Sequence, residues 1–114
     1  MRYSTQTKAL LLSAAQIARQ FGHGYVGSAH LLMAMSRGTD AVGNLLQSAG
    51  VEPKLTEQIV AVLYGVGTAG LPLPQGYSGQ MRRILKDAGR EAGYGKGVLV
   101  EPAHILLSLL RQKN

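Results

Sequence analysis

The chain has 114 residues, which is enough for one compact domain and too few for two ordinary ones. Apolar residues make up 46 % and aromatic residues only 5 %, so the core must consist mainly of Leu, Ala, Val, Ile and Met, a composition that favours helices over a β-sandwich. The absence of cysteine excludes a disulfide scaffold and thiol chemistry. The net charge is +6, but the positive residues are too scattered to indicate a nucleic-acid partner. The densest group of positive residues is Arg82, Arg83 and Lys86.

Four helices are predicted in the first 64 residues. The first runs from Thr5 to Phe21 behind Ser4 as N-cap, and its apolar residues recur at spacings of three and four. The others cover Ser28 to Ser36, Asp40 to Ala49, and a segment that starts at Pro53, a residue suited to a first turn. The inward faces are predicted to hold Leu10, Leu11, Ala14, Ile17, Ala18 and Phe21, then Leu31, Leu32 and Met35, then Val42, Leu45 and Leu46, and finally Leu55, Ile59, Val62, Leu63 and Val66.

Residues 65–76 read GVGTAGLPLPQG and are predicted to be a linker. Four glycines and two prolines make this segment too irregular for the interior of a helix or strand. It lacks the spacing and the Lys-Ser/Thr ending of a phosphate-binding P-loop, so a nucleotide site is not expected here.

The pattern of the first helices then begins again. At a constant offset of 74, the segment from Tyr3 to Arg37 matches the segment from Tyr77 to Arg111 with 11 identities in 35 positions, where chance would give ~2. The sequence therefore predicts an all-α fold of two tandem, pseudo-symmetric repeats. Repeat one covers residues 3–64 with four helices, and repeat two covers residues 77–114 with two.

One stretch of each copy resembles a known family. Residues 22–32, GHGYVGSAHLL, resemble the Gly-His-Asn-Tyr-Val-Gly-Thr-Glu-His-Leu-Leu signature of the Clp N-terminal domain, a double Clp repeat at the front of the ClpA, ClpB and ClpC ring unfoldases. Residues 100–107, VEPAHILL, are similar to the second copy of that motif. The first repeat is most like that of ClpC.

The resemblance implies a non-catalytic docking module. Such a domain receives unfolded protein substrates or a MecA-like adaptor and delivers them to a cytoplasmic ring unfoldase with a partner peptidase. ATP hydrolysis and proteolysis would then belong to other domains or subunits, since the chain has no Walker motif and no Ser-His-Asp arrangement. The alternative is a stand-alone regulatory Clp-repeat protein, in which Leu106, Leu109 or Leu110 would form an uncovered patch for a partner.

The candidate peptide- or adaptor-binding residues are Tyr3, Ser4, Ala29, Tyr77, Ser78 and Ala103. The two tyrosines precede equivalent helices, where they either pack on the first turn or line a peptide groove near the axis relating the repeats. The two serines place a hydroxyl at a helix N-terminus, where an anion could bind weakly. In ClpC-type domains, an acidic residue before the repeat histidine is associated with binding arginine phosphate; both equivalent positions here are alanine, so that activity is not expected.

The histidines are predicted to be structural. His30 and His104 each begin a strongly apolar helix, and no third ligand stands at useful spacing, so no metal site or cofactor is expected. Glu101 is expected to cap the helix that starts at Pro102, and His23 to be exposed in its Gly-rich link. Met33 and Met35 are expected in the core, the alternative being an adaptable binding surface. No signal peptide is predicted from the polar residues Met1 to Gln6, and no apolar run approaches the ~18 residues that cross a bilayer.

Overall fold

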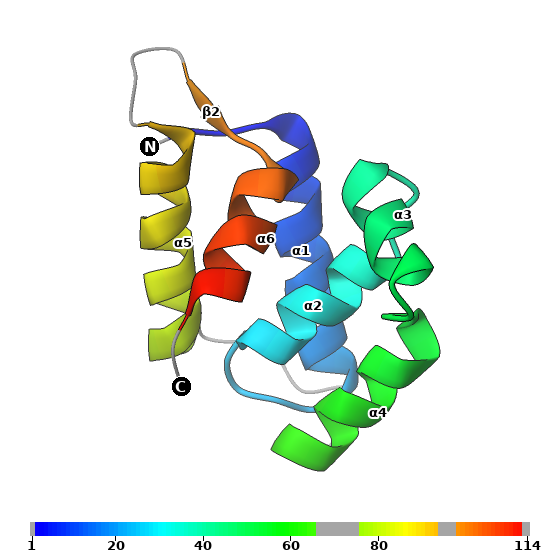
Figure 1. Cartoon of the computed structure of the whole chain (residues 1–114). Coiled ribbons are helices and arrows are strands. Elements are labelled where there is room, and N and C mark those ends of the chain that lie inside the picture. Colours follow the sequence, from blue (N-terminus) through cyan, green and yellow to red (C-terminus); the bar gives the residue numbers. More distant parts are fainter. Residues whose placement is uncertain (1, 66–75, 94–97, 113–114) are drawn as a thin grey trace.

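The computed structural model describes residues 2–65, 76–93 and 98–112. These residues form six helices and two very short strands (Figure 1). The elements, in chain order, are β1 (Arg2–Tyr3), α1 (Thr5–Gln20), α2 (Ser28–Ser36), α3 (Ala41–Ser48), α4 (Pro53–Tyr64), α5 (Gly79–Ala92), β2 (Leu99–Val100) and α6 (Pro102–Arg111). The predicted helical class is confirmed, and no described helix is long and apolar enough to cross a membrane.

The two sequence copies fold alike. α1 packs against α2, and α5 packs in the same way against α6. α1 begins behind Ser4, whose Oγ accepts a hydrogen bond from the backbone N–H of Thr7 at 3.1 Å. α5 begins behind Ser78, whose Oγ accepts one from the backbone N–H of Met81, also at 3.1 Å. Because both caps satisfy the same orphan donor, the predicted internal repeat is visible down to its helix termini.

The strands join the two repeats crosswise, which the sequence did not predict. β1 pairs in parallel with β2, so that Tyr3 lies opposite Val100. An isolated parallel bridge joins Val26 to Tyr77, the residues related to Val100 and Tyr3 by the 74-residue offset. In each repeat, the segment before the first helix therefore pairs with the segment before the second helix of the other repeat. The pairing follows the same pseudo-two-fold symmetry as the helices.

α2 is the most enclosed helix, since α1 covers one side of it and α3 and α4 cover another (Figure 1). Met33 and Met35 are 0 % and 2 % exposed, as expected for core residues. α6 has no equivalent of α4 among the described residues, so Leu110 is 72 % exposed although its counterpart Ser36 is fully buried. Leu106, which was predicted to be uncovered, is buried.

The predicted inward face of α4 is right only at Ile59, which is partly buried against the core. Val62 and Leu63 are 82 % and 65 % exposed, and Leu55 is exposed too. The helix instead turns Thr56 and Val60 to the core, where both are almost completely buried. Each of the buried hydroxyls of Thr56 and Ser36 donates to a carbonyl of its own helix, Thr56 to Pro53 and Ser36 to Met33, both at 2.8 Å. The two hydroxyl oxygens also lie 3.0 Å apart across the contact of α4 with α2.

The predicted face of α3 is right at two positions of three. Val42 and Leu46 are buried, whereas Leu45 is 60 % exposed. The orientation of this helix is fixed by a close backbone approach, because a Cβ at Gly43 would collide with the carbonyl of Gly38. Glycine at position 43 therefore lets the start of α3 lie directly on the preceding turn.

The helix ends agree with the predictions to within a residue or two. α1 stops at Gln20 with Phe21 as its C-cap, and α4 stops at Tyr64. Gly65 ends α4 with a positive φ of 71°, a conformation that favours glycine. The rest of the predicted linker, residues 66–75 and the Val66 assigned to the helix face, lies outside the described residues, as do residues 94–97.

Candidate functional site

The start of α1 meets the start of α6 at a first junction, formed by Tyr3, Ser4, Thr7, Val100 and Ala103. The backbone N–H of Ser4 donates to the carbonyl of Val100 at 3.1 Å. The Ser4 hydroxyl donates to Thr7 Oγ1 at 2.9 Å, and the Thr7 hydroxyl donates to the same Val100 carbonyl at 2.7 Å. Ser4 and Thr7 are buried, so these hydroxyls hold the junction together and face inward rather than toward a ligand.

The start of α5 meets the start of α2 at a second junction, formed by Val26, Ser28, Tyr77, Ser78 and Gln80. The backbone N–H of Ser78 donates to the carbonyl of Val26 at 2.9 Å. The Ser28 hydroxyl donates to Gln80 Oε1 at 3.2 Å on the surface. This junction is the symmetric counterpart of the first but contains no second buried hydroxyl, because Met81 stands where repeat one has Thr7.

The six predicted binding residues fall into two groups of three, one at each junction. In each group, the tyrosine and the serine come from one repeat and the alanine comes from the other, because the strands pair across the repeats. Ala103 is exposed at the start of α6, whereas Ala29 is only 6 % exposed. Burial and the neighbouring Tyr77 both raise the pKa of Tyr3. The groups are Tyr3, Ser4 and Ala103 at the first junction, and Tyr77, Ser78 and Ala29 at the second.

The repeat histidines are structural, as predicted. His30 Nδ1 accepts the backbone N–H of Gly27 at 2.9 Å, and His104 Nδ1 accepts that of Glu101 at the same distance. Each ring therefore reaches back from the third position of its helix to the N-cap residue, the task usually done by Glu or Gln. Glu101 occupies the predicted N-cap position, and its carbonyl accepts the backbone N–H of His104 at 3.0 Å.

The prediction that His23 is exposed is wrong. Its Nδ1 lies 2.7 Å from His30 Nε2 and its Nε2 lies 2.8 Å from the carbonyl oxygen of Gly65, while its ring stacks on Phe21. Because His30 Nδ1 accepts from Gly27, its Nε2 carries the proton and donates to His23, which in turn donates to Gly65. Burial, followed by the nearby His23, lowers the pKa of His30 to about 4.

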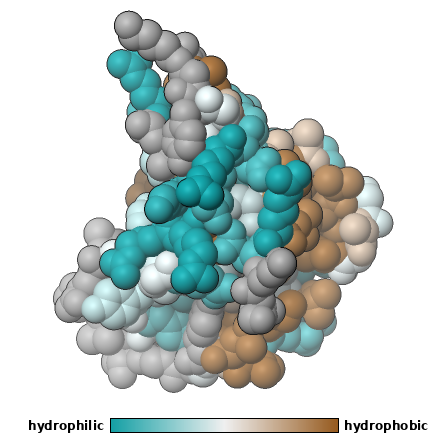
Figure 2. All heavy atoms as spheres, turned by 60° about the vertical axis from the view of Figure 1, so that its left-hand side comes forward, coloured by the Kyte–Doolittle hydropathy of each residue, from teal (hydrophilic) through white to brown (hydrophobic). Residues whose placement is uncertain are grey.

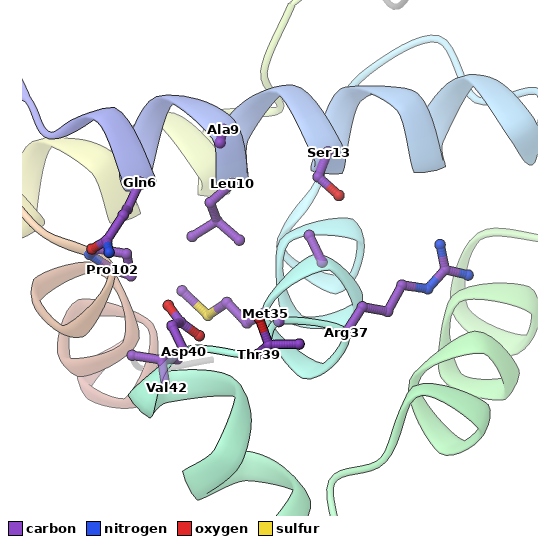
Figure 3. Close-up of a pocket in the computed structure, with 12 residues that line it drawn as sticks. Gln6, Ala9, Leu10, Ser13, Met35, Arg37, Thr39, Asp40, Val42 and Pro102 are labelled. Carbon is purple, nitrogen blue, oxygen red and sulfur yellow. The ribbon is translucent and has the colours of Figure 1, made fainter.

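A groove of about 380 Å³ opens beside the first junction, between α1, the turn from α2 to α3, and the start of α6. Figure 3 shows Leu10 on α1 and Met35 at the end of α2 pointing toward each other across it. This volume is in the range of small binding pockets and would accept one or two side chains of a peptide. The lining residues are Gln6, Ala9, Leu10, Ser13, Ala34, Met35, Arg37, Gly38, Thr39, Asp40, Val42 and Pro102.

The groove has an apolar floor and a polar rim. Asp40 and Arg37 bring one charge of each sign to the lining. Arg37 takes part in no ion pair within the described residues, whereas its counterpart Arg111 binds Glu91 at 2.7 Å. Repeat one has an apolar residue, Ile17, at the position of that glutamate. The groove can therefore bind an apolar side chain and offer hydrogen bonds and charge at its edge.

Sequence reasoning did not find this groove. Its residues come from three separate segments of the chain, and their types are those of ordinary helix surfaces. No group of three or more His, Asp or Glu side chains that could hold a metal ion occurs in the part of the chain that the structure describes.

Two Ser-capped helices, each followed by a His-capped helix and joined by crossed strands, define a tandem helical repeat. The chain belongs to the family of the Clp repeat (R) N-terminal domain, whose model matches residues 2–114. The similarity to known proteins extends over almost the whole chain.

The chloroplastic chaperone protein ClpC of Pisum sativum is 25 % identical over 112 residues, which cover 97 % of this chain and 12 % of that protein. The Hsp104 N-terminal domain of Candida albicans has the same fold, with a TM-score of 0.77 at 20 % identity, covering 97 % of this chain and 75 % of that one. A structure from a malarial protein secretion system has the same fold with a TM-score of 0.81 at 19 % sequence identity. The match covers 99 % of this chain and 79 % of that one. The chain thus spans about an eighth of the ClpC protein that it resembles.

Proposed function

We propose that this chain is the substrate- or adaptor-binding N-terminal domain of an ATP-dependent Clp chaperone or protease subunit. Membership of the Clp repeat family supports the proposal that this is an N-terminal domain of a Clp chaperone or protease subunit. The groove beside the first junction supports the proposal that it binds a protein segment. The ligand would be an unfolded protein segment or a segment of a MecA-like adaptor. ATP hydrolysis and peptide cleavage would occur in other domains or subunits, and the cytoplasmic location stays a prediction, while the ClpC of pea is chloroplastic.

The groove carries this proposal because it combines an apolar floor with polar side chains on elements that are fixed by packing. Leu10 would contact an apolar side chain of the bound segment above the buried Met35 and Val42. Gln6 and Ser13 lie where they could bond its backbone. No covalent step is involved. Binding of arginine phosphate is not expected, since alanine stands before both repeat histidines and Ala29 is buried.

The test compares two substitutions on α1 that differ only in place. Gln6 lines the groove and Gln16 does not, although both side chains are exposed on the same helix. Binding of a fluorescein-labelled peptide of Leu, Ser and Gly, without charged residues, is measured by fluorescence anisotropy. We expect Gln6→Arg to weaken binding at least fivefold, because the long side chain fills the groove, and Gln16→Arg to change it less than twofold. Equal effects of the two variants, or no binding to the unmodified chain, would contradict the proposal.

The exposure of α6 favours a second candidate, a stand-alone regulatory protein with a partner of its own. Leu107 and Leu110 are 38 % and 72 % exposed, and Leu109 is partly buried beside them. A reading frame that continues beyond Asn114 into a Walker A motif would support the first candidate. A reading frame that stops there, together with partner binding that is lost in Leu110→Ser, would support the second.

A further inference from the structure

The outward face of α5 carries a row of four cations. Arg82, Lys86 and Arg90 recur every four residues along the helix, and Arg83 stands beside the first two. All four side chains are exposed, and they are a third of the twelve Lys and Arg residues of the chain. Figure 2, in which the side of α5 comes forward, shows hydrophilic residues gathered across the middle of this face.

The other repeat shows that the fold does not require these cations. The positions of α1 that correspond to the four cations hold Lys8, Ala9, Leu12 and Gln16. α1 packs on α2 as α5 packs on α6, and it begins with the same serine cap. The duplication is therefore an internal comparison, in which one copy of the helix keeps a single cation and the other has four.

The row is also incompletely neutralised. Like charges four residues apart on a helix repel each other, so the spacing of Arg82, Lys86 and Arg90 lowers the stability of α5 slightly. The two acidic residues of the helix already have partners, since Asp87 accepts from Gln112 at 3.2 Å and Glu91 from Arg111 at 2.7 Å. Asp87 also lies 3.9 Å from Arg90, whereas Arg82 and Arg83 have no ion pair within the described residues.

We propose that this row, Arg82, Arg83, Lys86 and Arg90, binds an acidic segment of the protein that the domain receives. The inference rests on the proposed function and adds the chemistry of the partner. The row runs over nine residues, a rise of ~12 Å along the helix axis, which matches the length of three or four residues of an extended chain. Arginine side chains can bind carboxylates through two parallel hydrogen bonds, which makes Asp and Glu well suited to this surface.

Two observations place the start of the row beside the second junction. A Cβ on Gly79 would lie 3.8 Å from a guanidinium nitrogen of Arg82, so this side chain lies back toward the first turn of α5. Gln80 in that same turn belongs to the second junction through its bond from Ser28. α5 contains no aromatic residue on which a nucleic-acid base could stack, which favours an acidic polypeptide over a single-stranded nucleic acid.

The experiment uses a fluorescein-labelled twelve-residue peptide of alternating Glu and Ser, with a Gln-Ser peptide as its neutral match. Affinity is measured by anisotropy at 50 and 150 mM salt for the unmodified chain, for Arg82→Gln/Arg83→Gln and for Lys8→Gln/Lys54→Gln. The two double variants remove the same charge from exposed helix positions, but only the first removes it from the row. We expect the first to weaken binding of the Glu-Ser peptide about tenfold and the second less than twofold.

Equal losses in the two variants would overturn the proposal, because they would show an effect of net charge alone. The same holds if the Gln-Ser peptide binds as well as the Glu-Ser peptide, or if a twelve-base-pair DNA duplex binds more tightly at 150 mM salt. The uncharged Leu-Ser-Gly peptide separates this result from the test of the groove. Arg82→Gln/Arg83→Gln should leave its affinity unchanged, so either proposal can fail without the other.

Discussion

The ring of His30 is placed so that only its neutral form satisfies its neighbours. Nδ1 must accept from the backbone of Gly27 and Nε2 must donate to His23, so a second proton on the ring would break the first contact. His30 is 1 % exposed, and a buried imidazolium would lose its hydration as well. The residue thus ties the start of α2 to the end of α4, through His23 and the carbonyl of Gly65.

This arrangement predicts that the domain loses stability in mild acid. His30 titrates near 6.5 when unfolded and at about 4 when folded, so between these values the unfolded state binds more protons. The contribution of the neutral ring is complete above pH 6.5 and is lost as the pH falls toward 4. The total loss is about 3 kcal/mol. Urea unfolding measured between pH 7.5 and 4 should show the decrease.

A matched variant separates His30 from the carboxylates that titrate in the same range. His30→Gln keeps an acceptor at the third position of α2, where glutamine can cap, but removes the titration. We expect this variant to be less stable at pH 7 and to show a flatter dependence on pH. An unchanged slope in His30→Gln would assign the acid sensitivity to other groups.

The two capping serines should differ in what they contribute. Ser78 makes a single cap hydrogen bond, whereas Ser4 accepts from Thr7 and also donates to the buried Thr7 hydroxyl. Ser78→Ala should cost about 1 kcal/mol of unfolding free energy and Ser4→Ala about 2 kcal/mol, because the second leaves a buried hydroxyl without one of its partners. Urea unfolding of both variants measures the difference; a larger loss for Ser78→Ala would contradict the reported network.

At the level of elements, α4 shows why periodicity alone can choose the wrong face. Leu55, Ile59, Val62 and Leu63 form a regular apolar stripe, yet the helix is held in place by Thr56 and Val60 on the adjacent side. Packing against α2 decides which side is buried, and it includes a 3.0 Å contact between the hydroxyls of Thr56 and Ser36, twenty residues apart in the sequence, which no local pattern reports. The stripe itself lines a shallow hollow at the surface, formed by Gln58, Ile59, Val62 and Leu63.

Two valines on α4 provide a direct check of this orientation. Val60 is fully buried and Val62 is 82 % exposed, so the same change to alanine has different consequences. Val60→Ala should lower the free energy of unfolding by about 2 kcal/mol through the cavity that it leaves. Val62→Ala should change it by less than about 0.5 kcal/mol. Thermal or urea unfolding that shows similar losses would mean that the outer face is covered in solution.

The helices and the repeat could be predicted from the sequence, because they depend on spacing within a short window. Leu11, Ala14, Ile17 and Ala18 are all buried as their spacing indicates. The contacts of His23 could not, since its partner Gly65 is 42 residues away. The groove was missed for the same reason, as its walls come from α1, from the turn after α2 and from α6.

At the scale of the whole molecule, the duplication has produced one body with two dissimilar outer surfaces. The inner parts of the repeats keep the same caps, histidines and crossed pairing, whereas the outer residues have diverged to the groove near α1 and the basic row on α5. The fold agrees with the two solved structures at 19 % and 20 % sequence identity. The divergent exterior is where a difference in partner would be encoded.

The crossed pairing has a consequence for how the chain reaches its folded state. Since the segment before α1 is bonded to Val100, and the segment before α5 to Val26, neither half completes its own backbone hydrogen bonds. The halves should therefore behave as complementary fragments. Separately produced peptides 1–65 and 76–114 should each show little helical circular dichroism and regain it on mixing in equal amounts. Full helicity of either fragment alone would mean that each repeat folds without the other.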